Sequence, residues 1–280
     1  MKYLVTGGSG FLGTELIRKL VSQGHSIRTI ARNEGNLIKL KDQFPDVEIF
    51  FGDIANRFEV DQFMNCEFDG VFHLAAFKHV TLAETFPIEC INTNITGSLN
   101  VIDSGSRPLC KFIIGISTDK AAQVKGIYGA SKLIMESLFS QYEKVYPEIK
   151  YRIVRYGNIL YSTGSVLCKW KELISQGNEI TVTDLSATRF FWTVSQAVDL
   201  IFDCINQAEN SAPFVPEMKA IRIEDLINAM EYKYSPIKTG IKFKLIGLQK
   251  GENLHEKILE NGPYSNEVEL YGFDEILNLI

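Results

Sequence analysis

The chain has 280 residues, which is enough for one large domain or for a large domain with a smaller lobe. Apolar residues make up 45% of it and charged residues 22%, the balance of an ordinary soluble globular protein. The formal net charge of -5 argues against a general nucleic-acid-binding protein, since such proteins need a cationic face to offset phosphate charge.

The first half of the chain alternates short apolar runs with amphipathic stretches, a pattern typical of βαβ units and a parallel sheet. We predict strands over residues 3–6, 26–31, 47–51, 70–76, 111–117 and 151–156. We predict helices over residues 14–23, 85–106 and 128–146, the last of which ends before Pro147.

The pattern is looser after residue 156. A strand followed by a helix is predicted over residues 190–207, returning to the main sheet, and residues 218–230 have helical spacing. The predicted fold class is α/β, a doubly wound parallel sheet of the Rossmann type with a smaller C-terminal substrate lobe. Residues 1–155 plus 190–207 are expected to form the dinucleotide-binding domain, and residues 156–189 plus 208–280 the lobe.

The five cysteines and four histidines have no spacing that suits a disulfide framework or a metal site, so reduced thiols and no metal are expected. The sequence runs from Met1 directly into a strand and a glycine loop, which leaves no room for a signal peptide. No apolar run approaches the ~20 residues that span a bilayer. We therefore expect a cytoplasmic protein without a membrane or nucleic-acid partner.

A glycine loop stands between the first strand and the first helix, and it reads Thr6-Gly7-Gly8-Ser9-Gly10-Phe11-Leu12-Gly13. Its glycines at 7, 10 and 13 allow a tight turn, close approach to a pyrophosphate and close helix–strand packing. Free amides at the helix N-terminus then face the phosphates. The sequence therefore predicts that Gly7, Ser9, Gly10, Phe11, Leu12 and Gly13 bind a dinucleotide.

The end of the second strand distinguishes NAD from NADP. An acidic residue there accepts from the ribose 2′-hydroxyl, whereas an arginine suits a 2′-phosphate. Arg32 and Asn33 stand at this position and favour NADP; the alternative is that Arg32 is a solvated loop charge. Asp53 and Ile54 follow the third strand, where the Asp53 carboxylate can accept from the adenine amino group.

Tyr128 and Lys132 are four residues apart and therefore share one face of the predicted helix. A nearby cation lowers the pKa of a phenol, and a positive nicotinamide ring adds to that effect. The resulting phenolate can take a proton from a sugar hydroxyl while hydride leaves the same carbon. A tyrosine and a lysine at this spacing also occur by chance, but here they follow five strands and a dinucleotide loop.

Thr118, Asp119 and Lys120 stand at the carboxyl end of the fifth strand, the edge where a doubly wound sheet binds its ligands. Neighbouring residues of opposite charge at this edge could act as general acid and general base. The alternative is that Asp119 and Lys120 form a solvated pair in a loop.

Together these residues resemble the extended short-chain dehydrogenases, and more narrowly the inverting UDP-N-acetylglucosamine 4,6-dehydratases of the polysaccharide biosynthesis protein family. The resemblance covers most of the chain and is carried by residues 75–80, 92–98, 117–122, 128–132, 155–158, 188–190 and 251–256. Asp119-Lys120 is its specific part, since related dehydratases that retain configuration carry Asp-Glu there.

The resemblance implies a mechanism. Tyr128 deprotonates the hydroxyl on sugar carbon 4 while hydride passes to NADP, Thr118 hydrogen-bonds that oxygen, and Lys132 holds the tyrosine and the ribose. Lys120 then removes the proton from carbon 5 and Asp119 protonates the departing hydroxyl of carbon 6. Hydride returns to carbon 6, and reprotonation of carbon 5 from the other face would invert it.

A lysine base must be neutral when it acts, which requires desolvation or a neighbouring cation. We expect Lys78 or Lys132 to be that neighbour of Lys120.

The same resemblance implies further ligand contacts. The residues expected beside the cofactor are Ala75, Ala76, Ser117, Ile159 and Leu160. The residues expected to bind the UDP-sugar are Lys78, Asn158, Val166, Arg189 and Glu252, with Arg189 also bracing the lobe.

Two departures from the family pattern concern the substrate. Where the family has Arg-Pro, this chain has Gln249-Lys250, so the arginine expected to bind the pyrophosphate is missing. Two alternatives are open: Lys250 replaces the arginine as a point charge, or no residue replaces it. Tyr161 stands where the family has small residues and could narrow the pocket or change how the nicotinamide sits.

Other functions remain open at this point. A UDP-sugar epimerase, a 5,6-dehydratase or a net reductase would share the first oxidation, although the Asp119-Lys120 pair favours elimination over epimerisation at carbon 4. A non-catalytic NADP-binding sensor would keep the fold, but such proteins typically lose the tyrosine or the lysine. A homo-oligomer is expected, since proteins that the chain resembles pair through the helix bearing Tyr128 and Lys132. The N-acetyl preference, inversion at carbon 5, the pathway and the oligomer size stay undetermined.

Overall fold

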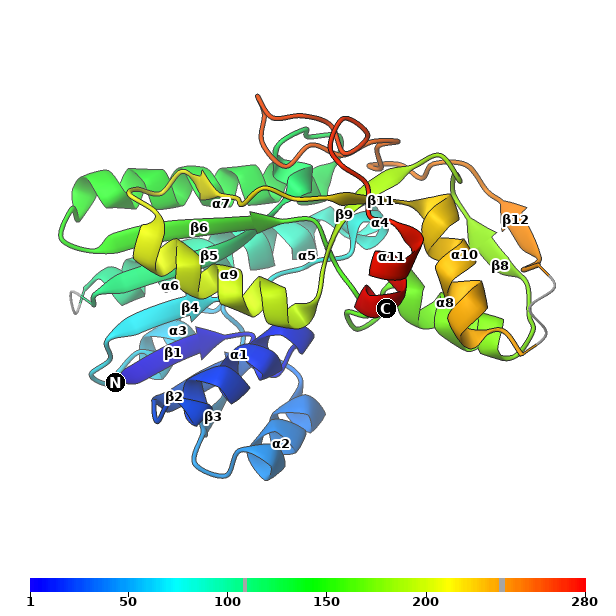
Figure 1. The fold of residues 1–280 in the computed structure, drawn as a ribbon. Helices are drawn as coiled ribbons and strands as arrows, with labels where there is room; N and C mark the ends of the chain where they lie inside the picture. Colours follow the sequence, from blue (N-terminus) through cyan, green and yellow to red (C-terminus); the bar gives the residue numbers. More distant parts are fainter. Residues whose placement is uncertain (108–109, 237–239) are drawn as a thin grey trace.

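The structure is a computed structural model that describes residues 1–107, 110–236 and 240–280. The larger part of the molecule is built around a seven-stranded parallel sheet (Figure 1). In spatial order the strands are β10 (Pro213–Phe214), β6 (Lys150–Tyr156), β5 (Phe112–Thr118), β4 (Gly70–His73), β1 (Lys2–Thr6), β2 (Ser26–Ala31) and β3 (Glu48–Phe51). The chain starts in the sheet interior at β1, moves outward to β3, and then crosses back to β4. This reversal between β1 and β4 is the position where doubly wound sheets bind ligands.

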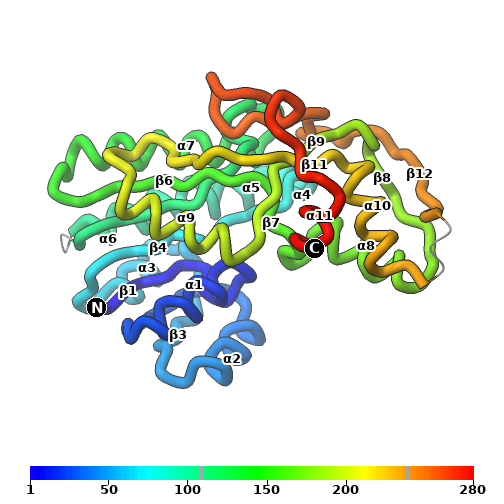
Figure 2. The backbone as a smooth tube through the Cα atoms, viewed as in Figure 1, coloured from blue at the N-terminus to red at the C-terminus, as the bar shows by residue number. Residues whose placement is uncertain are grey.

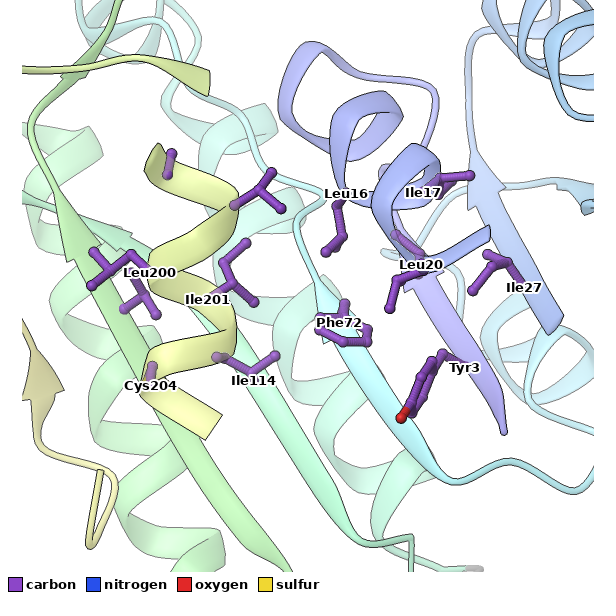
Figure 3. Packing of buried hydrophobic residues seen from close by; sticks show 14 of the residues in the cluster. Tyr3, Leu16, Ile17, Leu20, Ile27, Phe72, Ile114, Leu200, Ile201 and Cys204 are labelled. Atoms are coloured by element: carbon purple, nitrogen blue, oxygen red, sulfur yellow. The ribbon is translucent and has the colours of Figure 1, made fainter. Parts of the chain in front are cut away.

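Helices cover both faces of this sheet, which confirms the predicted doubly wound α/β fold. One face is covered by α1 (Phe11–Ser22), α2 (Glu34–Gln43) and α9 (Val194–Gln207), and the other by α3 (Arg57–Phe63), α6 (Gly97–Ser106) and α7 (Ile127–Val145). Figure 3 shows Leu16 and Leu20 of α1 and Ile201 of α9 meeting Phe72 and Ile114 of the sheet. Each of these five side chains is almost completely excluded from solvent, so burial of apolar surface holds the two helices on the sheet.

The helix predicted over residues 85–106 is present but interrupted. It consists of α5 (Pro87–Ile91), a π-helical turn (Asn92–Thr96) and α6, preceded by the separate short helix α4 (Val80–Thr85). Pro87 lacks an amide hydrogen and cannot continue α4, whereas it is well suited to the first turn of α5.

A smaller lobe lies beside the carboxyl edge of the sheet. It contains a three-stranded sheet and a two-stranded sheet, built from β7 (Asn158–Ile159), β9 (Thr188–Trp192), β11 (Ala220–Arg222), β8 (Ile180–Val182) and β12 (Phe243–Leu245). Its helices are α8 (Val166–Ser175), α10 (Ile223–Tyr234) and α11 (Phe273–Leu279). Of these elements, β8, β9, β11 and the three helices share a hydrophobic core of their own, distinct from the two cores of the main sheet.

Two predictions for the second half of the chain were wrong. The strand near residue 190 does not return to the main sheet: β9 pairs with β7 and with β11, and the strand that joins β6 is β10. Figure 2 shows the corresponding path, in which the chain leaves the lobe for α9, runs back along the sheet and re-enters the lobe. The predicted helix at 218–230 begins later, because residues 220–222 pair with β9 as β11. Short apolar runs fit a strand and a helix equally well, so only the pairing partner decides between them.

Helix α9 agrees with the prediction, and a capping box between Thr193 and Gln196 fixes its start. Helices α2, α3, α4, α8 and α11 were not predicted. The division of the chain into a dinucleotide domain and a substrate lobe stays a prediction. Among the residues that the structure describes, no helix combines the length and the apolarity needed to cross a membrane.

Candidate active site

A cleft of about 640 Å³ opens at the carboxyl edge of the main sheet, at the reversal between β1 and β4. Most of the residues that sequence reasoning assigned to a site line it. They are Gly7, Ser9, Gly10, Phe11, Leu12, Gly13, Arg32, Asn33, Asp53, Ile54, Ala75, Ala76, Lys78, Ser117, Thr118, Asp119, Lys120, Tyr128, Lys132, Asn158 and Ile159. The topology therefore brings together, in one cavity, residues that are up to about 150 positions apart in the sequence.

The glycine loop forms a cradle whose backbone is too close to its surroundings for side chains. Gly7 has a φ of 72°, and a Cβ added to it would lie 2.8 Å from the Cα of Ala75. A Cβ on Gly13 would lie 2.6 Å from the Cα of Gly8. Gly10 is the N-cap residue of α1 and has no side chain to cap it, so the first amides of the helix are available to a phosphate. These features fit a nicotinamide dinucleotide.

A buried histidine fixes the floor beneath this loop. The Thr6 hydroxyl lies 2.8 Å from Nδ1 of His73, and Nε2 of His73 lies 2.9 Å from the Ser98 hydroxyl. The Ala75 amide also donates to the Thr6 hydroxyl, over 3.1 Å. Burial lowers the pKa of His73 to about 3, so the ring is neutral and acts as a hydrogen-bonding link. Sequence reasoning missed His73, which reads as one more residue of a buried strand.

At the adenosine end of the cleft, Arg32 is held near the ends of β2 and β3. Its Nη1 lies 3.4 Å from Oδ2 of Asp53, and both side chains remain partly exposed. The Asn33 side chain accepts from the Asn36 amide over 2.8 Å and caps α2. A guanidinium at the end of β2, with no acidic residue in its place, suits a 2′-phosphate.

Tyr128 lies in the first turn of α7 and Lys132 one turn later. Nζ of Lys132 donates to the Ile116 carbonyl over 2.8 Å, and burial lowers the pKa of Lys132 to about 8 against the opposing charge of Glu136. Burial raises the pKa of Tyr128 to about 12, although a hydrogen bond with Thr118 opposes it. The expected lowering of the phenol pKa is therefore not seen in the protein alone, because desolvation of the phenolate outweighs the nearby positive charge.

The Asp119 side chain is 2% exposed and that of Lys120 13% exposed, which contradicts the alternative of a solvated pair. Nζ of Lys120 lies 2.9 Å from Oδ2 of Asp119 and also 2.9 Å from Oε1 of Glu256. Burial raises the pKa of Asp119, and Glu256 adds to the effect while Lys120 opposes it. Burial by itself would lower the pKa of Lys120, but the charges of Asp119 and Glu256 outweigh it and raise that pKa, with Arg189 opposing them.

Glu256 is a site residue that sequence reasoning missed. It ends the 251–256 segment that carries the family resemblance, but nothing in the sequence indicates that it reaches Lys120. The prediction that Lys78 or Lys132 is the cation beside Lys120 is corrected as well, since the cation acting on Lys120 is Arg189. Lys78 instead reaches across the cleft, where its Nζ donates to the Thr163 carbonyl over 2.8 Å.

The loop after β4 is supported by Asn94, which was also missed. Its side chain accepts from the Phe77 amide over 2.7 Å and donates to the Phe77 carbonyl over 3.0 Å. It also donates to the Ser131 hydroxyl over 2.9 Å, within the helix turn that carries Tyr128 and Lys132. Asn94 lies in the π-helical turn, and such turns often occur at functional sites.

The two departures from the family pattern lie away from the lining of the cleft. Tyr161 has a φ of 55° and turns into the lobe, where its hydroxyl lies 2.9 Å from that of Tyr234. Of the two alternatives for this residue, the structure therefore contradicts a narrowing of the pocket. Nζ of Lys250 lies 2.8 Å from Oε2 of Glu84, while Oε1 of Glu84 accepts from the Ile127 amide and caps α7. Lys250 therefore contacts Glu84, the residue that caps the start of the helix bearing Tyr128.

Four predicted site residues do not line the cleft. Leu160 is buried in the core of the lobe, and Val166 is half exposed at the start of α8. Glu252 accepts from the Gln249 amide within its own loop, over 3.1 Å. Arg189 lies behind Glu256, with Nε 3.6 Å from Oε1, and donates to the Leu254 carbonyl over 2.9 Å. No group of His, Cys, Asp or Glu side chains within the described ranges 1–107, 110–236 and 240–280 could hold a metal ion.

The sequence and the fold were compared with those of known proteins. The family described as "Polysaccharide biosynthesis protein" matches residues 3–276. An inverting UDP-N-acetylglucosamine 4,6-dehydratase of Campylobacter jejuni is 32% identical over 92% of this chain and 77% of that protein. A UDP-glucose 4-epimerase of Rickettsia akari is 30% identical over 98% of this chain and 82% of that protein. The X-ray structure of Pen from Bacillus thuringiensis has a TM-score of 0.91 and 30% identity, over 99% of this chain and 96% of that chain.

The glycine cradle gives the first testable prediction. Gly13→Ala is expected to weaken binding of nicotinamide dinucleotides by about tenfold or more, because the new methyl group meets the backbone of Gly8 and forces α1 away from the loop. The measurement is isothermal titration calorimetry with NADP and with NAD. Gly272→Ala is the matched control, since its methyl group would approach only the Glu275 side chain, at 3.6 Å. Equal affinities for Gly13→Ala and wild type would contradict the assigned phosphate site.

Proposed function

The chain belongs to the polysaccharide biosynthesis protein family of extended short-chain dehydrogenases, and from this premise we propose that it is an NADP-dependent UDP-N-acetylglucosamine 4,6-dehydratase that inverts carbon 5. The observation that carries the proposal is the buried contact of 2.9 Å between Asp119 and Lys120, in the same cleft as Tyr128 and Lys132. An acid and a base beside the oxidising residues are what elimination of water requires.

The first step uses the residues of α7 and the end of β5. Tyr128 takes the proton of the hydroxyl on carbon 4, and the Thr118 hydroxyl, which is close enough to hydrogen-bond the phenol, orients that oxygen. When bound, the dinucleotide supplies the hydride acceptor and, later, the hydride donor. Lys132 shares a buried environment with Tyr128, and its positive charge favours the phenolate once substrate and cofactor exclude water.

The second step uses the charged pair. A ketone at carbon 4 acidifies the proton on carbon 5, which Lys120 removes as a neutral amine, while Asp119 donates a proton to the oxygen leaving carbon 6. The raised pKa of Asp119 suits a carboxylic acid that must hold its proton near neutral pH. One proton moved from Lys120 to Asp119 across their 2.9 Å contact produces both active forms without a change in net charge.

An epimerase is the second candidate, because relatives named UDP-glucose 4-epimerase match nearly the whole chain. An epimerase at carbon 4 has no use for an acid and a base beside carbon 6. The contact of buried Asp119 with Lys120, whose side chain is 13% exposed, therefore favours elimination. A non-catalytic sensor is less well supported still, because maintaining buried charges is costly for a protein that makes no use of them.

The central test is turnover. With UDP-N-acetylglucosamine and a catalytic amount of NADP, we expect a product lighter by one water with a keto group on carbon 4, detected by mass spectrometry and proton NMR. Lys120→Ala is expected to lower the rate by about a hundredfold or more, because it removes the base. Lys125→Ala, an exposed lysine of the same loop, is expected to leave the rate unchanged. An unaltered rate for Lys120→Ala, or a carbon-4 epimer as the product, would contradict the proposal.

Cofactor choice has its own test. Arg32→Ala is expected to weaken NADP binding by about tenfold relative to NAD, since it removes a charged donor from the 2′-phosphate. Both dissociation constants are measured by quenching of intrinsic fluorescence. Arg18→Ala, on the exposed side of α1, serves as the control. The proposal for NADP fails if wild type binds NAD more tightly than NADP.

We propose further that the protein is a homodimer built on α5, α6 and α7. Apolar side chains project into solvent from these helices, among them Ile88, Ile91, Leu99, Leu133 and Ile134. Exposed apolar groups on neighbouring helices are typical of a protein–protein interface.

Sedimentation velocity tests this proposal. Wild type is expected to sediment as a dimer or a larger assembly, and Ile134→Glu as a monomer, because a buried unpaired carboxylate opposes association. Ile38→Glu, an equally exposed position on α2, is expected to keep the wild-type state. A monomeric wild-type protein would exclude the dimer.

A further inference from the structure

Glu256 is a buried carboxylate outside the lining of the cleft, in contact with the lining residue Lys120, and the proposed reaction gives it no role. Its side chain is 1% exposed, and Oε1 lies 2.9 Å from Nζ of Lys120. It comes from the C-terminal segment of the chain, whereas Lys120 and Asp119 stand at the end of β5. A carboxylate at this depth is costly unless it performs a structural or chemical task.

The backbone and side chain of Glu256 are held from several directions. Its amide donates to the Ser265 hydroxyl over 2.9 Å, and its carbonyl accepts from the Ser265 amide over 2.8 Å. Oε2 accepts from Nδ2 of Asn253 over 3.2 Å, and Nε of Arg189 lies 3.6 Å from Oε1. Glu256 is therefore held by contacts with Ser265, Asn253 and Arg189 in addition to its contact with Lys120.

Charges alternate through this part of the site, in the order Asp119, Lys120, Glu256 and Arg189. Glu256 lies between two cations, Lys120 and Arg189. Asp119 is paired with Lys120 and is the carboxylate whose pKa is raised by burial and by the charge of Glu256. Of the two carboxylates that contact Lys120, Asp119 is the one that exchanges a proton with it in the proposed reaction, whereas Glu256 is also paired with Arg189.

We propose that Glu256 is a positioning residue that holds the Lys120 amine beside Asp119 and supplies the fixed negative charge for the ammonium that forms there. This inference rests on the proposed dehydratase function. In the elimination step the bond from carbon 5 to hydrogen breaks and the proton passes to Nζ of Lys120. The electron pair forms the double bond between carbons 5 and 6, the bond from carbon 6 to oxygen breaks, and that oxygen takes the proton of Asp119 and leaves as water.

This step turns a neutral amine into an ammonium 2.9 Å from Glu256, so the fixed carboxylate stabilises the charge that develops. Glu256 exchanges no proton in this step, so it changes neither the proton count nor the charge balance. Its hold on Nζ also keeps the amine at one place in the cleft, where a displacement of about 1 Å can cost about a hundredfold in rate.

The test separates hydride transfer from elimination in a single turnover of UDP-N-acetylglucosamine. Glu256→Gln is expected to leave the appearance of reduced nicotinamide absorbance nearly unchanged, and to slow the loss of water by between about tenfold and about a hundredfold. The groups facing Lys120 are Asp119, Glu256, Arg189 and Tyr128. Removing one negative charge among them lowers the pKa of Lys120. In a plot of the elimination rate against pH, the range in which the rate rises as Lys120 loses its proton is therefore expected to move to lower pH.

Two further variants keep the result interpretable. Glu256→Asp keeps the negative charge. Its elimination rate is expected to depend on pH as in wild type, even if the shorter side chain lowers the rate itself. Glu260→Gln removes a carboxylate of the same segment that pairs with Arg155 and is expected to change neither step. Equal losses in both steps with an unchanged pH dependence would overturn the proposal, because a purely structural role has that signature.

A readout without substrate distinguishes failure of this inference from failure of the proposed function. Proteins labelled with ¹³C at the lysine ε-carbons are titrated by NMR, and the Lys120 signal is assigned by its absence in Lys120→Ala. Lys120 is expected to titrate at lower pH in Glu256→Gln than in wild type. If wild type does not dehydrate the sugar nucleotide, the proposed function fails, but this shift still supports the positioning contact; an unmoved titration would refute it.

Discussion

The reversal of strand order between β1 and β4 is the constraint on which the site depends. Because all seven strands are parallel, their carboxyl ends lie at one edge of the sheet. At the reversal, the loops that follow β1 and β4 run to opposite sides of the sheet and leave a cleft between them. The glycine loop after β1, Arg32 after β2 and the Thr118–Lys120 turn after β5 thereby face one cavity. Apolar packing of α1 and α9 on one face and of α7 on the other holds these helices on the sheet.

Burial determines the chemistry of the groups collected at this edge. It keeps Tyr128 a neutral phenol and lowers the pKa of Lys132 to about 8. The charge of a bound dinucleotide would change both pKa values further. It also raises the pKa of Asp119, which turns an ordinary carboxylate into a candidate acid. Lys120 differs from these three, because two carboxylates outweigh its desolvation. The C-terminal segment supplies one of those carboxylates, Glu256, so the charge environment of Lys120 depends on segments far apart in the sequence.

The parts of the site that could be predicted from sequence are the local ones. Glycine spacing, four-residue helical spacing and a strand followed by charged residues are each contained in a short stretch, and the structure places all of them in the cleft. The pairing of β9, the inward turn of Tyr161 and the reach of Glu256 to Lys120 depend on how distant segments pack. No short stretch records that information. The pKa of Tyr128 was misjudged for the same reason, since desolvation is a property of the folded state.

The most direct measurement uses UDP-N-acetylglucosamine that carries deuterium on carbon 4, with the product examined by NMR. If Tyr128 begins an oxidation that the Asp119–Lys120 pair converts into elimination, the deuterium should be found on carbon 6 of the 4-keto product. Transfer within one site predicts this even when unlabelled free cofactor is added. Deuterium retained on carbon 4 of an epimer would show that the pair does not eliminate water, and deuterium lost to free cofactor would show a net oxidation. Either result would contradict a dehydratase.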